Sequence, residues 1–161
     1  MIRIETDRLV IRESSGRDFS RIYAMLLSEG NAGPDENEEL EKYLAYIHTA
    51  YPVFGFGLWS VVLKETGDVI GWCGLQPIGN EDTPLGRIEL GYLIDREFRR
   101  KGYACEACRA IMDYAFQRLE LDEVYVQIDG QNKQSLRLAQ RLGFTKAGDG
   151  LWVQSCDAWL A

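Results

Sequence analysis

The 161 residues predict a mixed α/β fold, in which a central β-sheet carries helices on its faces. Two observations carry this prediction. Residues 88–128 have the pattern strand, helix, strand, and a crossover of this kind joins parallel strands. Residues 58–76 have the pattern of two strands around Glu65-Thr66-Gly67-Asp68, which is typical of an antiparallel hairpin. The sheet is therefore expected to contain both kinds of pairing.

The N-terminal part of the chain predicts one strand and two helices. Arg8–Arg12 is a short apolar run between two charges, which favours a strand. Residues 19–27 carry apolar side chains at helical spacing, and Asn31–Pro34 breaks that helix. A second helix is expected over 35–47. Its acidic start has two readings, either carboxylates that favour the helix dipole or a charge that attracts cationic substrates.

The C-terminal part alternates between strands and helices. After the hairpin we expect a loop at 77–86, a strand at Ile88–Ile94, a helix at Ala104–Leu119, a strand at Glu123–Ile128, a helix at Asn132–Leu142, and one or two strands within Leu151–Leu160. Asn132 is a suitable N-cap for the last helix, and Gly143 is a suitable residue just after it. The total is six to seven strands and about four helices.

Composition and charge restrict the classes of protein. The length suits a single domain over residues 1–161. The net charge of −7 argues against nonspecific nucleic-acid binding. No apolar run approaches the roughly 20 residues of a membrane span, so no membrane partner is expected. The N-terminus alternates apolar and charged residues without the apolar region of a secretory signal, which predicts a cytoplasmic protein.

The four cysteines are Cys73, Cys105, Cys108 and Cys156. A cytosolic chain keeps its thiols reduced. Cys105 and Cys108 form a CxxC pair, which is open to three readings: a redox pair, half a zinc site, or packing on the apolar stripe of a helix. The i, i+3 spacing places both residues near that stripe and favours packing. No metal site is therefore expected.

A cluster of cations runs against the acidic character of the chain. The helix expected from residue 104 is preceded by Arg99-Arg100-Lys101-Gly102-Tyr103. A turn that leads into a helix N-terminus presents unpaired backbone N–H groups and the positive end of the helix dipole. Gly102 allows the backbone to come close to an anion. The segment predicts a phosphate or pyrophosphate site, with a solvated basic turn as the alternative.

This segment resembles the acyl-CoA signature of the GNAT superfamily of N-acetyltransferases. That signature reads Gln or Arg, two residues, Gly, one residue, then Gly or Ala, and Arg99–Ala104 matches it. Asn132-Lys133-Gln134-Ser135 and Leu142-Gly143-Phe144 follow in the order of the family. The opening Thr6–Arg12 is similar to the branch that includes the ribosomal-protein N-terminal acetyltransferases. The resemblance implies one GNAT-like acyl-CoA N-acyltransferase domain.

The resemblance also implies acetyl-CoA as co-substrate. The residues implied in binding it are Leu93, Ile94, Arg99, Arg100, Lys101, Gly102, Tyr103, Ala104 and Asn132. The backbone from Arg100 to Ala104 would surround the pyrophosphate, and the cations would add charge-assisted hydrogen bonds. Backbone groups of Leu93 and Ile94 would pair with the pantetheine arm. Asn132 would bond to that arm, although a helix cap is an equally good reading of this residue.

The implied reaction is direct attack of an amine on the thioester in a ternary complex. Many GNAT members protonate the leaving thiolate with a Tyr seven residues after the motif Asn, and that position is Ala139 here. The ribosomal branch has a Ser three residues after the Asn, which is Ser135 here. Its hydroxyl would donate to the sulfur or relay a proton. The alternative is a first-turn Ser that bonds to its own backbone.

Glu89 is the candidate general base for the amine. It lies within the strand implied to carry the thioester, where a carboxylate is costly without a role or a partner. Two alternatives stay open. One is that Glu89 serves only as the partner of an Arg such as Arg87, and the other is that a chain of water molecules removes the proton without a dedicated base.

The acceptor is expected to be a primary amine, on a protein or peptide N-terminus or on a small molecule such as a polyamine or aminoglycoside. Five aromatic residues are candidates either for an acceptor cleft or for the core: Tyr51, Phe54, Phe56, Trp59 and Trp72. The alternative function is a non-catalytic acyl-CoA-binding regulatory module. A P-loop protein is disfavoured because GxxxxGK[ST] is absent. The expected assembly is a monomer or a homodimer.

Overall fold

The computed structural model describes residues 1–78 and 87–161, and these form one eight-stranded sheet in the order β1-β2-β3-β4-β5-β6-β8-β7. Its strands are β1 (Arg3–Glu5), β2 (Leu9–Arg12), β3 (Leu58–Leu63), β4 (Val69–Pro77), β5 (Ile88–Ile94), β6 (Glu123–Gln127), β7 (Thr145–Gly148) and β8 (Leu151–Ser155). The helices are α1 (Phe19–Ser28), α2 (Glu36–Phe54), α3 (Tyr103–Gln117), α4 (Lys133–Arg141) and α5 (Cys156–Leu160). Most of the expected loop at 77–86 lies outside the described residues.

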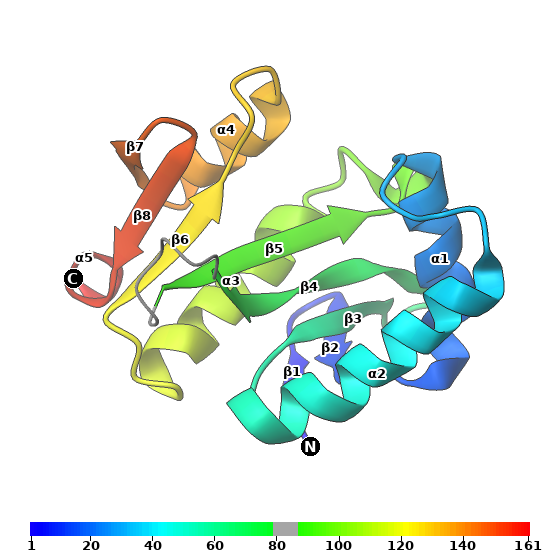
Figure 1. Cartoon of the computed structure of the whole chain (residues 1–161). Coiled ribbons are helices and arrows are strands. Elements are labelled where there is room, and N and C mark those ends of the chain that lie inside the picture. Colours follow the sequence, from blue (N-terminus) through cyan, green and yellow to red (C-terminus); the bar gives the residue numbers. More distant parts are fainter. Residues whose placement is uncertain (79–86) are drawn as a thin grey trace.

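The pairing confirms a mixed sheet. Strands β1 to β5 are antiparallel neighbours, and β3 and β4 form the expected hairpin. Strands β5 and β6 are parallel, but their register contains a single pair, Glu89↔Tyr125. Beyond that pair the two strands point away from each other (Figure 1). We call this opening between β5 and β6 the fork.

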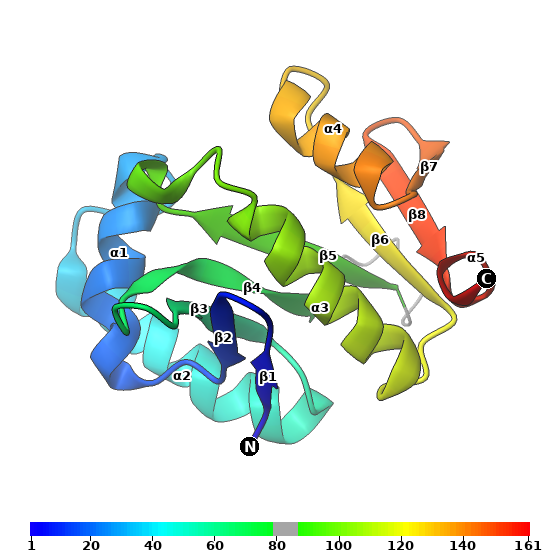
Figure 2. The same cartoon turned by 180° about the vertical axis from the view of Figure 1, so that it is seen from behind.

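Helices cover both faces of the sheet. Helices α1 and α2 lie on one face and α3 on the other (Figures 1 and 2). The alternation of β2 reflects this arrangement, since Leu9 and Ile11 pack in the cluster beneath α3 while Val10 packs with Ile22 of α1. The expectation of helices on the faces of the sheet is therefore confirmed.

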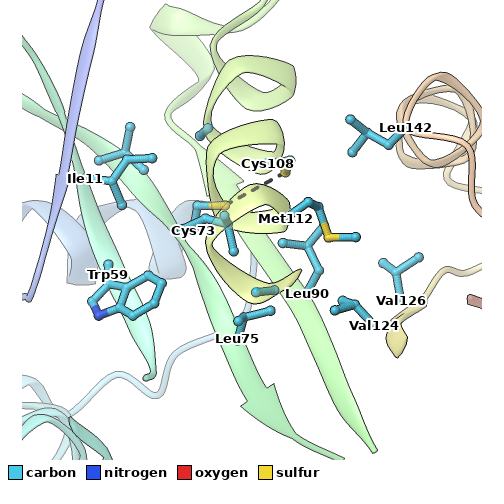
Figure 3. Close-up of a cluster of buried hydrophobic side chains, with 14 of the residues drawn as sticks. Ile11, Trp59, Cys73, Leu75, Leu90, Cys108, Met112, Val124, Val126 and Leu142 are labelled. Carbon is cyan, nitrogen blue, oxygen red and sulfur yellow. Dashed lines mark hydrogen bonds between the residues drawn. The ribbon is translucent and has the colours of Figure 1, made fainter. Parts of the chain in front are cut away.

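The larger core cluster lies between the sheet and α3. Of the apolar stripe predicted for this helix, Ala107, Cys108, Ile111, Met112 and Ala115 are buried, while Ala104 and Leu119 are partly buried; Phe116 is buried in addition. Figure 3 shows Cys73 of β4 facing Cys108, with Val124 and Val126 of β6 on the side of Met112. Helix α3 therefore holds the two arms of the fork together by apolar packing on one face of the sheet.

A buried polar group joins β2 to the start of α1. The Asp18 carboxylate accepts two hydrogen bonds from Arg12, Nη1 to Oδ2 at 2.7 Å and Nη2 to Oδ1 at 2.9 Å. It also accepts from Ser15 N at 2.9 Å and from Ser60 Oγ at 3.0 Å. Burial alone raises the pKa of Asp18, but the hydrogen bonds from Arg12 and Ser15 bring it below its ordinary value.

The expected numbers of strands and helices are too low. Strands β1 and β7 are short edge strands. All residues of β7 are exposed, so β7 lacks the alternation of a half-buried strand, whereas in β1 the half-buried Ile4 alternates with the exposed Arg3 and Glu5 over only three residues. The segment Leu151–Leu160 divides into β8 and α5. Ser155 ends the strand by capping α5, where its side chain accepts from Ala158 N at 3.1 Å.

Candidate active site

The turn between β5 and α3 has the backbone of an anion site. Arg100 has φ 64° and Gly102, the residue before α3, has φ 83°. In the described residues, the backbone N–H groups from Arg100 to Cys105 have no hydrogen-bond acceptor, and the first helical bond runs from Glu106 N to Gly102 O. Successive unpaired N–H groups in such a turn form a concave binding site for an anion. We call residues 99–104 the phosphate turn.

The N-terminal segment supports the phosphate turn from behind. Arg8 Nη1 donates to the Lys101 carbonyl at 2.8 Å, and its guanidinium lies 4.4 Å from the centre of the Tyr103 ring. The Glu106 carboxylate accepts from Thr6 Oγ1 at 2.6 Å and from Arg8 N at 2.9 Å. Burial raises the pKa of Glu106, but these hydrogen bonds outweigh it and hold the pKa below its ordinary value. Thr6 and Arg8 therefore fix the start of α3.

The three cations of the phosphate turn are not equivalent. Arg99 is engaged within the protein, because Nη2 donates to Glu29 Oε1 at 2.7 Å and Nε donates to the Ile94 carbonyl at 2.8 Å. Arg100 and Lys101 are exposed, and neither has an ion pair within the described ranges. The charge available to an incoming anion is therefore that of Arg100 and Lys101, while Arg99 shapes the turn.

The free edge of β5 leads from the fork to the phosphate turn. Past Glu89, the edge of β5 that faces β6 has no partner strand within residues 1–78 and 87–161. The Leu93 side chain packs toward the α1 cluster and that of Ile94 is buried toward α3, so their backbones line this edge. The Ile94 carbonyl already accepts from Arg99. An extended ligand has open backbone groups here, as along the edge of any sheet.

On the α3 side of the fork, two hydroxyl groups meet. Tyr92 Oη of β5 donates to Ser135 Oγ of α4 at 2.8 Å. Ser135 lies in the first turn of α4, where its N–H donates to the side chain of Asn132 at 3.1 Å. The capping role of Asn132 is thus present in the structure, and the Ser135 hydroxyl bonds to Tyr92 rather than to backbone.

Glu89 lies at the base of the fork on the opposite face of β5. Its carboxylate accepts from Gln76 Nε2 at 2.6 Å, across the antiparallel register. Arg87 lies with its guanidinium carbon 5.0 Å from the centre of the Tyr125 ring, and no ion pair joins it to Glu89 among the described residues. The partner of Glu89 is therefore an amide rather than an Arg.

The structure brings the predicted site residues to one region but divides them between two faces. Residues opposite each other in the β4–β5 register share a face, so Glu89 lies with Gln76, and Tyr92 with Cys73. Cys73 faces α3. Glu89 and Ser135 consequently lie on opposite faces of β5, with the fork between them.

The sequence reading missed three residues that shape this region. Arg8 was part of a segment used for the resemblance, but it had no assigned role. The spacing of two residues between Tyr92 and each of Leu90 and Ile94, which puts the three on one face of the strand, was the available signal that Tyr92 faces away from Glu89. Glu29 had no signal, because it contacts Arg99 across 70 positions of sequence.

Most of the other residues considered for the site, namely Ala139 and the aromatic side chains, lie in the hydrophobic core or pack against it. Ala139, where many GNAT members have Tyr, is buried in the core. Trp59 and Phe56 are also core residues, whereas Phe54 is 47% exposed. Trp72 is half-buried and covers Gly91, where an added Cβ would lie 3.2 Å from the indole ring. The absence of a side chain at Gly91 therefore lets the Trp72 indole lie directly over the β5 backbone, on the face of β5 that carries Glu89.

Residues 1–78 and 87–161 contain neither a cluster of metal-ligating side chains nor a membrane-spanning helix. No group of three or more His, Cys, Asp or Glu side chains is placed to hold a metal ion in that part of the chain. No helix there combines the length and apolar character needed to cross a bilayer.

The fork, its free strand edge and the phosphate turn belong to a mixed α/β sheet that carries helices on both faces. Residues 8–145 match the family described as Acetyltransferase (GNAT) domain. The chain belongs to this GNAT acetyltransferase family.

Relatives and a solved structure agree with that family. YkkB of Bacillus subtilis strain 168 is 28% identical over 146 residues, which cover 88% of this chain and 84% of YkkB. A protein of the same strain named "Putative ribosomal N-acetyltransferase YdaF" is 39% identical over 84 residues, 50% of this chain and 46% of YdaF. The crystal structure of an acetyltransferase from Agrobacterium tumefaciens C58 superposes with a TM-score of 0.76 at 27% identity, covering 95% of this chain and 92% of that one.

Proposed function

We propose that residues 1–161 act as one N-acetyltransferase domain, which transfers the acetyl group of acetyl-CoA to a primary amine in a ternary complex. The observation that carries the proposal is the row of unpaired N–H groups from Arg100 to Cys105 at the end of an open strand edge. A pyrophosphate fits such a row, and a pantetheine arm is a chain of amides suited to a free strand edge.

The phosphate turn would hold the diphosphate. Backbone N–H groups of Gly102, Tyr103 and Ala104 would donate to its oxygens, and Arg100 and Lys101 would add charge-assisted hydrogen bonds. An added Cβ at Gly102 would lie 3.3 Å from the Arg8 guanidinium, so this backbone is tightly supported from behind. Arg99 holds the turn through its Nε and Nη2 groups, and its Nη1 group, which has no partner among the described residues, would donate to the co-substrate.

The free edge of β5 would hold the rest of the co-substrate. Backbone groups of Leu93 would pair with the pantetheine arm, and those of Ile94 would contribute through its N–H side, since its carbonyl is engaged. Asn132 uses its side-chain oxygen to cap α4, which leaves its NH₂ group to donate to the same arm.

The two faces of β5 suit two requirements of the reaction, the removal of a proton from the amine and the stabilisation of the departing sulfur. The amine nitrogen bonds to the thioester carbon, the carbon–sulfur bond breaks, and the electron pair leaves with the sulfur. On one face Glu89 accepts the proton that the amine loses, directly or through water. On the other face the Ser135 hydroxyl donates a hydrogen bond to the sulfur.

The acceptor that fits best is the N-terminus of a peptide or protein. At the acidic start of α2, Asp35 caps the helix and Lys42 pairs with Glu38 and Glu39. These contacts offset part of the charge that would attract a polycation there. The similarity to YdaF, whose name refers to ribosomal N-acetylation, agrees with a peptide acceptor.

A non-catalytic acyl-CoA-binding module is the second candidate, and Ala139 is the observation that favours it, because the Tyr acid of many GNAT members is replaced there. This candidate predicts binding of acetyl-CoA without turnover. Release of free thiol from acetyl-CoA upon addition of peptides or small primary amines separates the two functions.

The test of the site is calorimetric titration with acetyl-CoA, with ATP and NAD as controls. We expect micromolar binding of acetyl-CoA alone. The Gly102→Glu variant should abolish binding, because it places a carboxylate at the anion site. Gly67→Glu is the matched control, since Gly67 also has a positive φ, 77°, but lies in the β3–β4 hairpin. Wild-type affinity in Gly102→Glu would refute the assignment.

A further inference from the structure

The hydroxyl pair Tyr92–Ser135 is the polar link between the two arms of the fork on the α3 face. Tyr92 belongs to β5, and Ser135 to the helix that follows β6. The arms share one backbone pair, Glu89↔Tyr125, and separate beyond it. Any group that enters the fork along the free edge of β5 therefore meets this pair on its α3 side.

The direction of the hydrogen bond decides what Ser135 can do. A hydroxyl has one proton to donate and two lone pairs to accept with. Because Tyr92 Oη donates to Ser135 Oγ, the oxygen of Ser135 is fixed as an acceptor and its own proton is left to point elsewhere. In the described part of the chain, that proton has no acceptor. A first-turn Ser without such a partner ordinarily turns to the backbone of its own helix.

The Tyr92 side chain is itself held in place. Its ring packs against the main core cluster, in the register opposite Cys73. Burial raises the pKa of Tyr92 to about 12, although the hydrogen bond with Ser135 opposes the shift. The phenol therefore stays protonated and remains a donor across the neutral pH range.

We infer that Tyr92 is a positioning residue for catalysis, which orients the Ser135 hydroxyl so that it donates to the sulfur of the departing thiolate. The inference rests on the proposed function. The proton of Tyr92 stays on Tyr92, and the carbon–sulfur electron pair leaves with a sulfur stabilised by the Ser135 hydrogen bond. The pair thus takes the place of the Tyr that Ala139 replaces. Ser135 lies one turn earlier on the same helix, α4, and Tyr92 lies on β5.

The test is a double-mutant cycle on kcat with Tyr92→Phe, Ser135→Ala and the double variant, using acetyl-CoA and the primary amine that the wild type acetylates fastest. Each single variant should lower kcat by about 10- to 100-fold, as for loss of one transition-state donor. The Kd of acetyl-CoA should stay within about two-fold, a change of less than about 0.5 kcal/mol. Because Tyr92 acts through Ser135, the double variant should be no slower than Ser135→Ala.

Controls separate positioning from packing. Tyr92→Phe keeps the ring and should unfold at the wild-type temperature. Tyr114→Phe removes a hydroxyl from a ring that packs edge-on against Trp59, 5.5 Å away, and should leave kcat unchanged. Ser135→Thr keeps a hydroxyl and should recover most of the rate lost in Ser135→Ala.

Two sets of results would overturn the inference, and they can be told apart. A kcat of Tyr92→Phe within about two-fold of the wild type, or a double variant in which the two losses multiply, would overturn the inference alone. A wild type that binds acetyl-CoA but acetylates no amine would overturn the proposed enzyme function, and this inference with it.

Discussion

The Glu29 carboxylate at the end of α1 lies 2.7 Å from Arg99 Nη2 in the phosphate turn, and the same Oε1 accepts from Arg96 Nε at 3.1 Å. The hydrogen bond from Arg99 is the main cause that lowers the pKa of Glu29, followed by that from Arg96. Arg99 in turn holds the Ile94 carbonyl. This ion-pair cluster ties the helix on one face of the sheet to the turn that begins α3.

Glu29→Gln should weaken acetyl-CoA binding while the protein stays folded. The variant loosens Arg99 and Arg96, so the turn loses part of its fixed shape. Because partly exposed ion pairs contribute up to about 1 kcal/mol, the Kd should rise by up to about five-fold. Calorimetric titration measures this. Glu38→Gln, which removes another exposed ion pair on α2, is the control and should bind like the wild type. Unchanged affinity in Glu29→Gln would show that the turn keeps its shape without the pair.

Asp18→Asn should destabilise the protein strongly. The substitution leaves Arg12 half-buried without its carboxylate, and breaking such a pair costs about 3 kcal/mol. Urea unfolding at pH 7 measures the change. Asp68→Asn, in the exposed turn between β3 and β4, is the control and should change the free energy of unfolding by less than about 0.5 kcal/mol.

The same pair sets a pH dependence. Since the pKa of Asp18 is lower in the folded than in the unfolded state, its stabilisation is fully present above the ordinary Asp pKa of about 3.9. That stabilisation is lost as the pH falls through the lower folded-state pKa. The wild type should therefore lose more stability than Asp18→Asn between pH 5 and acid pH. Parallel loss in both proteins would contradict the assignment.

Glu89→Gln tests the general base. The amide keeps a polar partner for Gln76 but accepts no proton from the amine, so kcat should fall by about 100-fold or more. Glu123→Gln, on the neighbouring strand and bonded to Tyr125 at 2.7 Å, is the control and should keep its activity. A loss of less than about three-fold in Glu89→Gln would favour removal of the proton by water, because general bases are ordinarily worth 10²-fold or more.

The cysteines should differ sharply in reactivity. Cys73 and Cys108 are fully buried with their sulfur atoms 3.8 Å apart, and burial raises the pKa of Cys108 well above its ordinary value. N-ethylmaleimide should modify the partly exposed Cys105 and Cys156 in the folded protein, and the buried pair only after unfolding. Mass spectrometry of peptides reads out each site. Early modification of Cys108 would contradict this expectation.

Cys108→Ala should separate packing from chemistry. Loss of one buried sulfur atom should lower the free energy of unfolding by about 1 kcal/mol, as for other small deletions in a core. The affinity for acetyl-CoA should be unchanged, because the Cys108 side chain packs in the core against Cys73 and is not part of the phosphate turn. Loss of binding without loss of stability would instead support a functional CxxC pair.

The elements that could be predicted from the sequence are those in which the local spacing of apolar and capping residues matches the burial seen in the structure. The stripe of α3, the β3–β4 hairpin and the cap at Asn132 all follow from spacings within about a dozen residues. The exposed strand β7 was missed because no residue of it is buried. The phosphate turn could be located from its Gly and its cations. The division of labour among those cations could not, since the engagement of Arg99 depends on Glu29, far away in sequence.

The candidate catalytic residues were located by resemblance, but their arrangement needed the tertiary structure. Strand alternation distinguishes the faces of Glu89 and Tyr92. It does not reveal that α4 returns over the Tyr92 face and places Ser135 within 2.8 Å of it. Contacts between separate elements of this kind have no period in the sequence.

Only one register pair joins β5 to β6, so the backbone hydrogen bonding of the sheet is nearly interrupted at this point. The C-terminal part of the chain, from β6 onward, is attached chiefly by apolar packing of Val124, Val126 and Leu142 beneath α3. Apolar packing stabilises less on cooling, whereas the backbone hydrogen bonds between strands such as β3, β4 and β5 do not depend on the hydrophobic effect. Amide exchange in β6 should therefore speed up relative to β4 as the protein is chilled, because the apolar packing beneath α3 that attaches β6 weakens.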